Sequence, residues 1–124
     1  MRVFKTKAFS RFSRKAGLDD AALCKAVIDA ERGLIDADLG GGVIKQRIAR
    51  RGSGKSSGFR TVILYRRRTR AFFVYGFAKS DRANVSQDEL AALKELASAM
   101  LEYSDAEITK AIESGPMIEV TCNE

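Results

Sequence analysis

The first third of the chain alternates between short apolar clusters and polar residues at helical spacing. Val3-Phe4 predicts a short strand, and the apolar positions over 8–12 predict a short helix that ends near Gly17. A longer amphipathic helix is predicted between Asp19, a candidate N-cap, and Gly33. Its inward positions are Leu23, Ala26, Val27, Ala30 and Leu34.

The periodicity changes to two-residue alternation after the glycines at 40–42. Three strands are predicted, at about 43–50, 59–66 and 71–78, and residues 67–69 are short enough to form a hairpin connection between the last two. These strands predict a three-stranded antiparallel meander.

The first of these strands divides its side chains between two faces. Ile44 and Ile48 point one way, whereas Lys45, Arg47 and Ala49 point the other. We therefore expect one face of this strand to be core and the other to be cationic.

Two further helices are predicted after the strands. Ser86 with Glu89, and Ser104 with Glu107, each form a capping-box pattern at a helix start. The buried stripe of the first helix is Leu90, Leu93, Ala97, Met100 and Leu101. Residues 117–122 form either a last edge strand or a tail. The fold class is α+β: a short N-terminal strand, two helices, the meander, and C-terminal helices packed on the sheet.

Composition excludes several kinds of site. The 124 residues include 45% apolar residues but no run near the roughly 20 that span a membrane. No targeting segment is visible, so we expect a cytoplasmic protein without a membrane partner. No histidine is present, and Cys24 and Cys122 lie far apart, so we expect no metal and no cofactor. For the cysteines we expect two reduced thiols, with a disulfide as the alternative.

Charge is distributed unevenly along the chain. Residues 1–82 contain 20 basic and 7 acidic groups, and residues 83–124 contain 2 and 9, so a net charge of +13 is followed by one of −7. Between Leu39 and Ser80 there are eleven Lys or Arg residues and no Asp or Glu. This excess predicts a polyanionic partner, most simply a nucleic-acid backbone. Gly54-Lys55-Ser56 copies only the end of a P-loop, without its first glycine or following helix, so nucleotide hydrolysis is not expected.

The ordered motifs of the middle region resemble the RelE/ParE toxin superfamily, nearest its HigB-like branch. The resemblance rests on G-G-V-I-K-Q-R-I at 41–48, G-S-G-K-S-S-G at 52–58 followed by Arg60, and F-V-Y-G-F-A-K-S at 73–80. It covers about residues 1–103, which are expected to form a RelE-like toxin domain. Residues 104–124 are expected to be an acidic helix and tail packed on the same domain, either folded back on the basic face or covering the sheet edge.

The resemblance implies the toxin of a type II toxin-antitoxin system, a metal-independent endoribonuclease that cleaves mRNA on the ribosome and inhibits translation. Its expected partners are mRNA, the ribosome and a cognate antitoxin, the last being a helix-turn-helix DNA-binding protein. The residues matching the family's catalytic site are Lys45, Arg47, Lys55, Arg60 and Lys79. Further RNA-binding residues are expected at Arg50, Arg51, Arg66, Arg68, Tyr75 and Arg82.

Fixed cations on one concave face would stabilise the negative charge that builds at phosphorus during RNA cleavage. The general base is unassigned, because the family's C-terminal tyrosine has no counterpart in this chain. The nearest tyrosines are Tyr65 and Tyr75 within predicted strands and Tyr103 late in a predicted helix. Two alternatives stay open at this stage: a DNA gyrase inhibitor of the ParE type, and a non-catalytic nucleic-acid-binding module.

Overall fold

The computed structural model describes residues 1–49 and 58–122, which form four helices and six strands. In chain order these are β1 (Arg2–Thr6), α1 (Lys7–Ala16), α2 (Asp20–Glu31), β2 (Ala37–Gly40), β3 (Val43–Ile48), β4 (Phe59–Arg66), β5 (Arg70–Ala78), α3 (Gln87–Met100), α4 (Asp105–Ser114) and β6 (Met117–Val120). The α+β class predicted from the sequence is confirmed.

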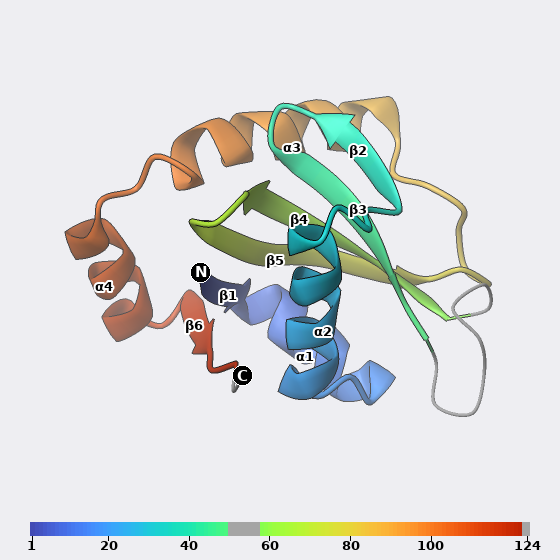
Figure 1. Ribbon diagram of the computed structural model, residues 1–124, viewed down its shortest axis with the longest axis horizontal. Coiled ribbons are helices and arrows are strands. Elements are labelled where there is room, and N and C mark those ends of the chain that lie inside the picture. The colour runs from blue at the N-terminus through green and yellow to red at the C-terminus, as the bar shows by residue number, and fades with distance from the viewer. Residues whose placement is uncertain (50–57, 123–124) are drawn as a thin grey trace.

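The strands form one mixed sheet in the order β2-β3-β4-β5-β1-β6 (Figure 1). The meander β3-β4-β5 is antiparallel as predicted. β1 pairs in parallel with β5 through Arg2–Lys5, and β6 pairs antiparallel with β1 as an edge strand. A short strand that the residue pattern did not predict, β2, forms a hairpin with β3. Gly41 and Gly42 make that turn with φ values of 61° and 84°, which a glycine adopts without strain.

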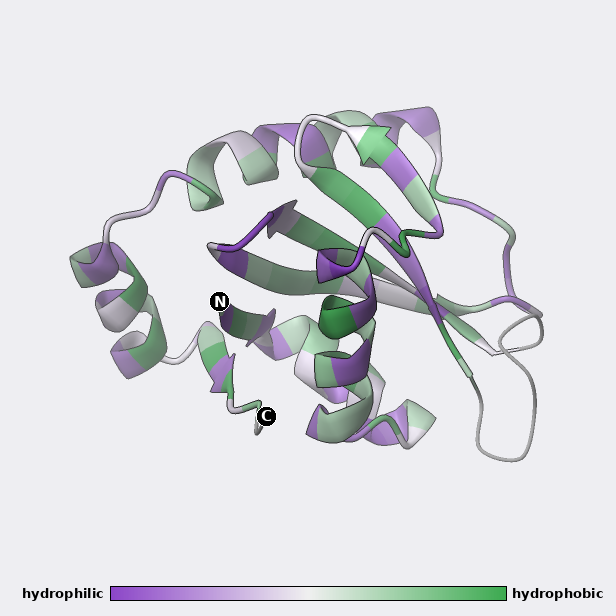
Figure 2. Ribbon diagram, viewed as in Figure 1, coloured by the Kyte–Doolittle hydropathy of each residue, from purple (hydrophilic) through white to green (hydrophobic). Residues whose placement is uncertain are grey.

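Helices cover both faces of the sheet. α1 and α2 pack on one face around Phe9, Leu23 and Ile63, while α3 and α4 pack on the other around Phe72 and Ile108 (Figure 1). The division predicted for the first strand holds in β3, where Ile44 and Ile48 are buried on one face while Lys45 is half-buried and Arg47 exposed on the other. The central strands are apolar on both faces, and Figure 2 shows hydrophobic positions along strands that carry helices on both sides. On the second face, Lys45 and Arg47 of β3 and Arg60 of β4 lie in neighbouring positions of the sheet.

Local capping signals locate the helix starts. Thr6 and Asp19 accept from the backbone at α1 and α2, and the capping boxes predicted at Ser86 and Ser104 are both present. The predicted second helix ends early, because α2 stops at Glu31 and Leu34 is 62% exposed instead of inward. No helix in residues 1–49 and 58–122 is long and apolar enough to cross a membrane.

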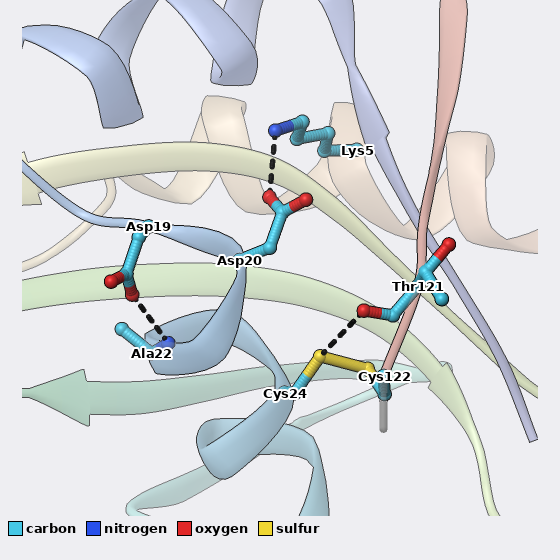
Figure 3. The surroundings of a disulfide bond; sticks show 7 residues. All are labelled: Lys5, Asp19, Asp20, Ala22, Cys24, Thr121 and Cys122. Atoms are coloured by element: carbon cyan, nitrogen blue, oxygen red, sulfur yellow. Dashed lines mark hydrogen bonds and ion pairs between the residues drawn. A yellow bond between two sulfur atoms is a disulfide. The ribbon is translucent and has the colours of Figure 1, made fainter.

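A disulfide joins the C-terminal tail to α2. Cys24 lies in α2 and Cys122 follows β6, and the two sulfur atoms are bonded (Figure 3). The carbonyl oxygen of Thr121 lies 3.8 Å from the Cys24 sulfur. The expectation of two reduced thiols is therefore wrong: the antiparallel pairing of β6 with β1 carries the tail across the sheet edge to α2, which sequence spacing did not reveal.

Gly76 is the point where α1 meets β5 most closely. A Cβ atom at this position would lie 2.3 Å from Cε2 of Phe12. We expect Gly76→Ala to lower the free energy of unfolding by about 1–3 kcal/mol, because the Phe12 ring must leave its place. Urea unfolding of the natural chain and of Gly76→Ala measures this loss. The same pair is then compared in a chain that also carries Phe12→Ala. The same alanine should cost far less there, and an equal cost in both would contradict the contact.

Candidate functional site

Three strands bring the predicted cations to one end of the sheet, on the face that carries α3. Arg47 of β3 is the cross-strand partner of Arg60 in β4, and Arg60 is in turn the partner of Phe77 in β5. Two residues further along β4, Val62 pairs with Lys45 of β3 on one side and with Tyr75 of β5 on the other. Because paired residues in a sheet point to the same face, Lys45, Arg47 and Arg60 lie in one patch with the two aromatic rings.

A bulge in β5 places Tyr75 on this face. Val62 pairs with Tyr75 and Ile63 with Phe73, so Val74 is an extra residue between them. Both Val74 and Tyr75 consequently pack toward the α3 side, whereas Phe73 belongs to the core under α1 and α2. Bulges commonly redirect a side chain near functional sites. No feature of the sequence alternation revealed this shift.

Each strand cation has its own environment. The Lys45 ammonium donates to the Asn84 side-chain oxygen at 2.8 Å, and Arg47 Nε lies 2.6 Å from an oxygen of Asp36. Arg60 is only 4% exposed. An ammonium has three donors, and Asn84 is the one hydrogen-bond partner of the Lys45 ammonium within residues 1–49 and 58–122, so two N–H groups stay available there for another acceptor. Asn84 and Asp36 were not predicted as partners, because each lies in a loop far along the chain from its cation.

Arg82 connects the loop after β5 to α3. Its guanidinium donates to the Tyr75 hydroxyl at 3.0 Å, to both Glu89 oxygens at 2.6 and 3.1 Å, and to the Asn84 carbonyl at 2.9 Å. It also lies 5.6 Å from the Phe77 ring centroid. Four contacts occupy this side chain, so Arg82 holds Tyr75 and the loop that carries Asn84 in fixed positions.

A groove of about 410 Å³ opens beside Tyr75 and Phe77. Phe12 and Phe59 contribute two further rings to its lining, and Arg82 lies at its border. An aromatic groove suits an unstacked nucleic-acid base, because bases stack on rings. The charged residues that line it are Lys15, Asp81 and Arg82, whereas Lys45, Arg47 and Arg60 lie outside its lining. Phe77 itself is 5% exposed and belongs to the core, so Tyr75 is the ring more available to a ligand.

The other predicted residues fall into three groups. Lys79 is exposed one residue past β5, and its N–H donates to the Gly58 carbonyl, which places it at the same end of the sheet. Arg66 and Arg68 lie at the opposite end of β4, roughly 20 Å from Arg60 at about 3.3 Å per residue. The predicted residues that lie outside the described part of the chain are Arg50, Arg51 and Lys55.

Two of the arginines in and beside the patch are paired with carboxylates, Arg47 with Asp36 and Arg82 with Glu89. The Arg82 guanidinium and the Ser86 amide lower the pKa of Glu89 to about 2, so this carboxylate stays ionised and neutralises Arg82. Glu89 also raises the pKa of Arg82. No group of three metal-binding side chains occurs in the part of the chain that the structure describes. The arrangement favours binding a phosphate and stabilising added negative charge on it.

Acid should weaken the Arg82–Glu89 contact. Because the folded-state pKa of Glu89 lies below the usual value near 4.3, its contribution to stability is complete above about pH 4.3 and is lost as pH falls toward 2. We expect the melting temperature of the natural chain to fall more between pH 5 and pH 2.5 than that of Glu89→Gln. Glu113→Gln, which alters an exposed carboxylate, should keep the natural slope. Equal slopes for Glu89→Gln and the natural chain would contradict the assignment.

Comparison with known proteins places the chain in a toxin family. The model of the family described as the RelE toxin of the RelE/RelB toxin-antitoxin system matches residues 1–120. This range includes every described element of the site and extends through α4 and β6, beyond the boundary at residue 103 expected from the motifs. No curated protein matches the chain.

Proposed function

The chain belongs to the RelE toxin family of toxin-antitoxin systems, and we propose that it is a ribosome-dependent mRNA endonuclease that inhibits translation. The observation that carries this proposal is the patch in which Lys45, Arg47 and Arg60 share one sheet face with Tyr75. Family membership implies a cognate antitoxin. That this antitoxin is a helix-turn-helix protein, that the chain is HigB-like and that it acts in the cytoplasm are parts of the proposal.

The proposed reaction uses the substrate's own nucleophile. The ribose 2′-oxygen attacks the adjacent phosphorus, the bond to the 5′-oxygen of the next nucleotide breaks, and a 2′,3′-cyclic phosphate and a 5′-hydroxyl form. A proton leaves the 2′-hydroxyl and a proton reaches the departing 5′-oxygen. Negative charge grows on the non-bridging oxygens in the transition state, so cations already fixed in place lower the barrier.

The residues of the patch would have different roles in binding and cleaving the RNA. Lys45, positioned by Asn84, has donors left for a non-bridging oxygen, and Arg60 supplies charge from beneath the patch. Lys55, Lys79 and Arg47 are proposed to complete the cationic site. Tyr75, held by Arg82, is placed to stack on a base beside the scissile phosphate. Arg82 acts by positioning Tyr75 rather than by contacting the phosphate.

Ribosome dependence follows from the need for in-line geometry. The 2′-oxygen, phosphorus and 5′-oxygen must be nearly collinear, and an mRNA held on the ribosome can be presented in that conformation. Holding reactants in a reactive conformation can contribute several kcal/mol to catalysis, on the order of 7–11 in favourable cases. Free mRNA would be cut slowly by the same residues.

Expression of the chain in bacteria, with mapping of mRNA ends, tests the proposed function. We expect growth arrest with new ends inside translated regions, and none when initiation on the same mRNA is blocked. Growth arrest with intact mRNA and inhibited DNA supercoiling would instead identify a gyrase inhibitor. Salt-sensitive nucleic-acid binding without arrest or cleavage would identify a binding module.

A further inference from the structure

The hairpin turn between β4 and β5 carries a conformation that is costly for its sequence. Arg68 has a φ of 64°, and it is the one non-glycine residue with a positive φ in residues 1–49 and 58–122. Glycine or asparagine adopts this left-handed region at little or no cost, whereas a long side chain is strained there. An arginine in a strained backbone conformation raises the question of what the side chain of Arg68 does.

The turn is held rigidly by α2. The Glu31 carboxylate accepts a hydrogen bond from the Arg68 backbone N–H at 3.0 Å and another from the Tyr65 hydroxyl. Thr69 bonds the carbonyls of Arg66 and Arg67 at 3.2 and 3.0 Å. Although burial opposes ionisation, the Tyr65 and Arg68 donors lower the pKa of Glu31. The positive charge of Arg67 lowers the pKa of Glu31 further, so this carboxylate accepts from the backbone and a hydroxyl and also attracts Arg67.

Of the four arginines at this turn, two contact another side chain or the backbone, and two have no carboxylate partner in the described part of the chain. Arg66 pairs with Glu102, and Arg70 donates to the Tyr103 carbonyl at 2.6 Å. The side chains of Arg67 and Arg68 are exposed, and no carboxylate within residues 1–49 and 58–122 lies within 4.0 Å of either guanidinium. Figure 2 shows this turn as a hydrophilic tip at the end of two hydrophobic strands.

We propose that Arg67 and Arg68 form a second RNA contact that binds backbone phosphates at the end of the sheet opposite Lys45 and Arg60. Guanidinium forks match phosphate oxygens, and Arg67 and Arg68 are exposed on a turn that Glu31 holds. Binding a phosphate there breaks no ion pair shorter than 4.0 Å among the described residues. The roughly 20 Å between the two ends exceeds the reach of any side chain, so this contact is separate from the cleavage site. The proposal rests on the proposed function for the identity of its polyanion.

Arg68→Gly tests the proposal, because the substitution relieves the backbone while removing the cation. We expect an unchanged melting temperature or one raised by up to about 5 °C. We expect affinity for RNA to fall about tenfold, and the slope of log affinity against log salt to decrease by about 0.7–0.9. Arg68→Asn should behave like Arg68→Gly, because asparagine also tolerates a positive φ. Arg11→Gln removes one positive charge elsewhere on the surface and is the control for the change in net charge.

Two RNA probes distinguish the source of the phosphates: a 20-nucleotide single-stranded RNA and vacant ribosomes. A loss confined to vacant ribosomes identifies ribosomal RNA, and a loss with the oligonucleotide identifies mRNA. Binding losses no larger than those of Arg11→Gln with both probes would overturn the proposal. Since binding is measured without cleavage, a chain that does not cut mRNA but shows the Arg68-dependent loss would refute only the proposed function.

Discussion

Replacing Lys45 with glutamine is expected to slow ribosome-dependent mRNA cleavage by about 10²–10³-fold, with little change in folding. Lys45 is half-buried on the face shared by Arg60 and Tyr75, and among the described residues its ammonium donates to one exposed loop residue, Asn84. Removing its ammonium takes away a preorganised donor to the transition-state oxygens, while glutamine keeps most of the stem. Single-turnover cleavage on programmed ribosomes measures the rate.

Two further variants separate catalysis from charge and from folding. Lys110→Gln removes an exposed lysine of α4 and should cleave at the natural rate. Arg60→Gln should slow cleavage at least as much as Lys45→Gln, but Arg60 is buried, so its melting temperature must be measured beside it. A Lys45→Gln protein that is folded and cuts at the natural rate would remove Lys45 from the site.

Breaking the disulfide is expected to lower the free energy of unfolding by about 2–5 kcal/mol. Cys24 and Cys122 are 98 residues apart, so the bond closes nearly the whole chain into a loop and strongly restricts the unfolded state. The double variant Cys24→Ser/Cys122→Ser should unfold at lower urea concentration than the oxidised natural chain.

Reduction provides the matched comparison. A reducing agent should bring the natural chain close to the stability of the double serine variant and leave that variant unchanged. Amide exchange should accelerate first in β6, because the bond ties its end to α2 (Figure 3). A natural chain with the same urea midpoint in both redox states, while thiol titration shows the bond opening and closing, would contradict this expectation.

Elements with strong local signals could be predicted from the sequence, and those made by long-range pairing could not. The capping boxes at Ser86 and Ser104 and the apolar run of β4 are encoded within a few residues, and the structure has a helix start or a strand at each. The place of β1 between β5 and β6, the short edge strand β2, and the meeting of Cys24 with Cys122 depend on partners far along the chain. No local periodicity specifies such partners.

The candidate site divides in the same way. Alternation correctly predicted that Lys45 and Arg47 share a face, and cross-strand register adds Arg60 to it. The bulge at Val74 and the contacts of Arg82 depend on the packing of β5 against α3, which the pattern of residues does not encode. Counting charges along the sequence also placed Arg66 and Arg68 in the same cationic group as Arg60. They are near Arg60 in sequence, but they lie at the opposite end of β4.

The central claim is that this chain cleaves mRNA and needs the ribosome to do so. The most direct measurement incubates the purified chain with one end-labelled mRNA, either free or bound to ribosomes with a defined codon in place. We predict a cut within the positioned codon that leaves a 2′,3′-cyclic phosphate, at a rate at least about 10²-fold above that on free mRNA. An uncut mRNA on ribosomes, with a folded chain bound to them, would contradict the account.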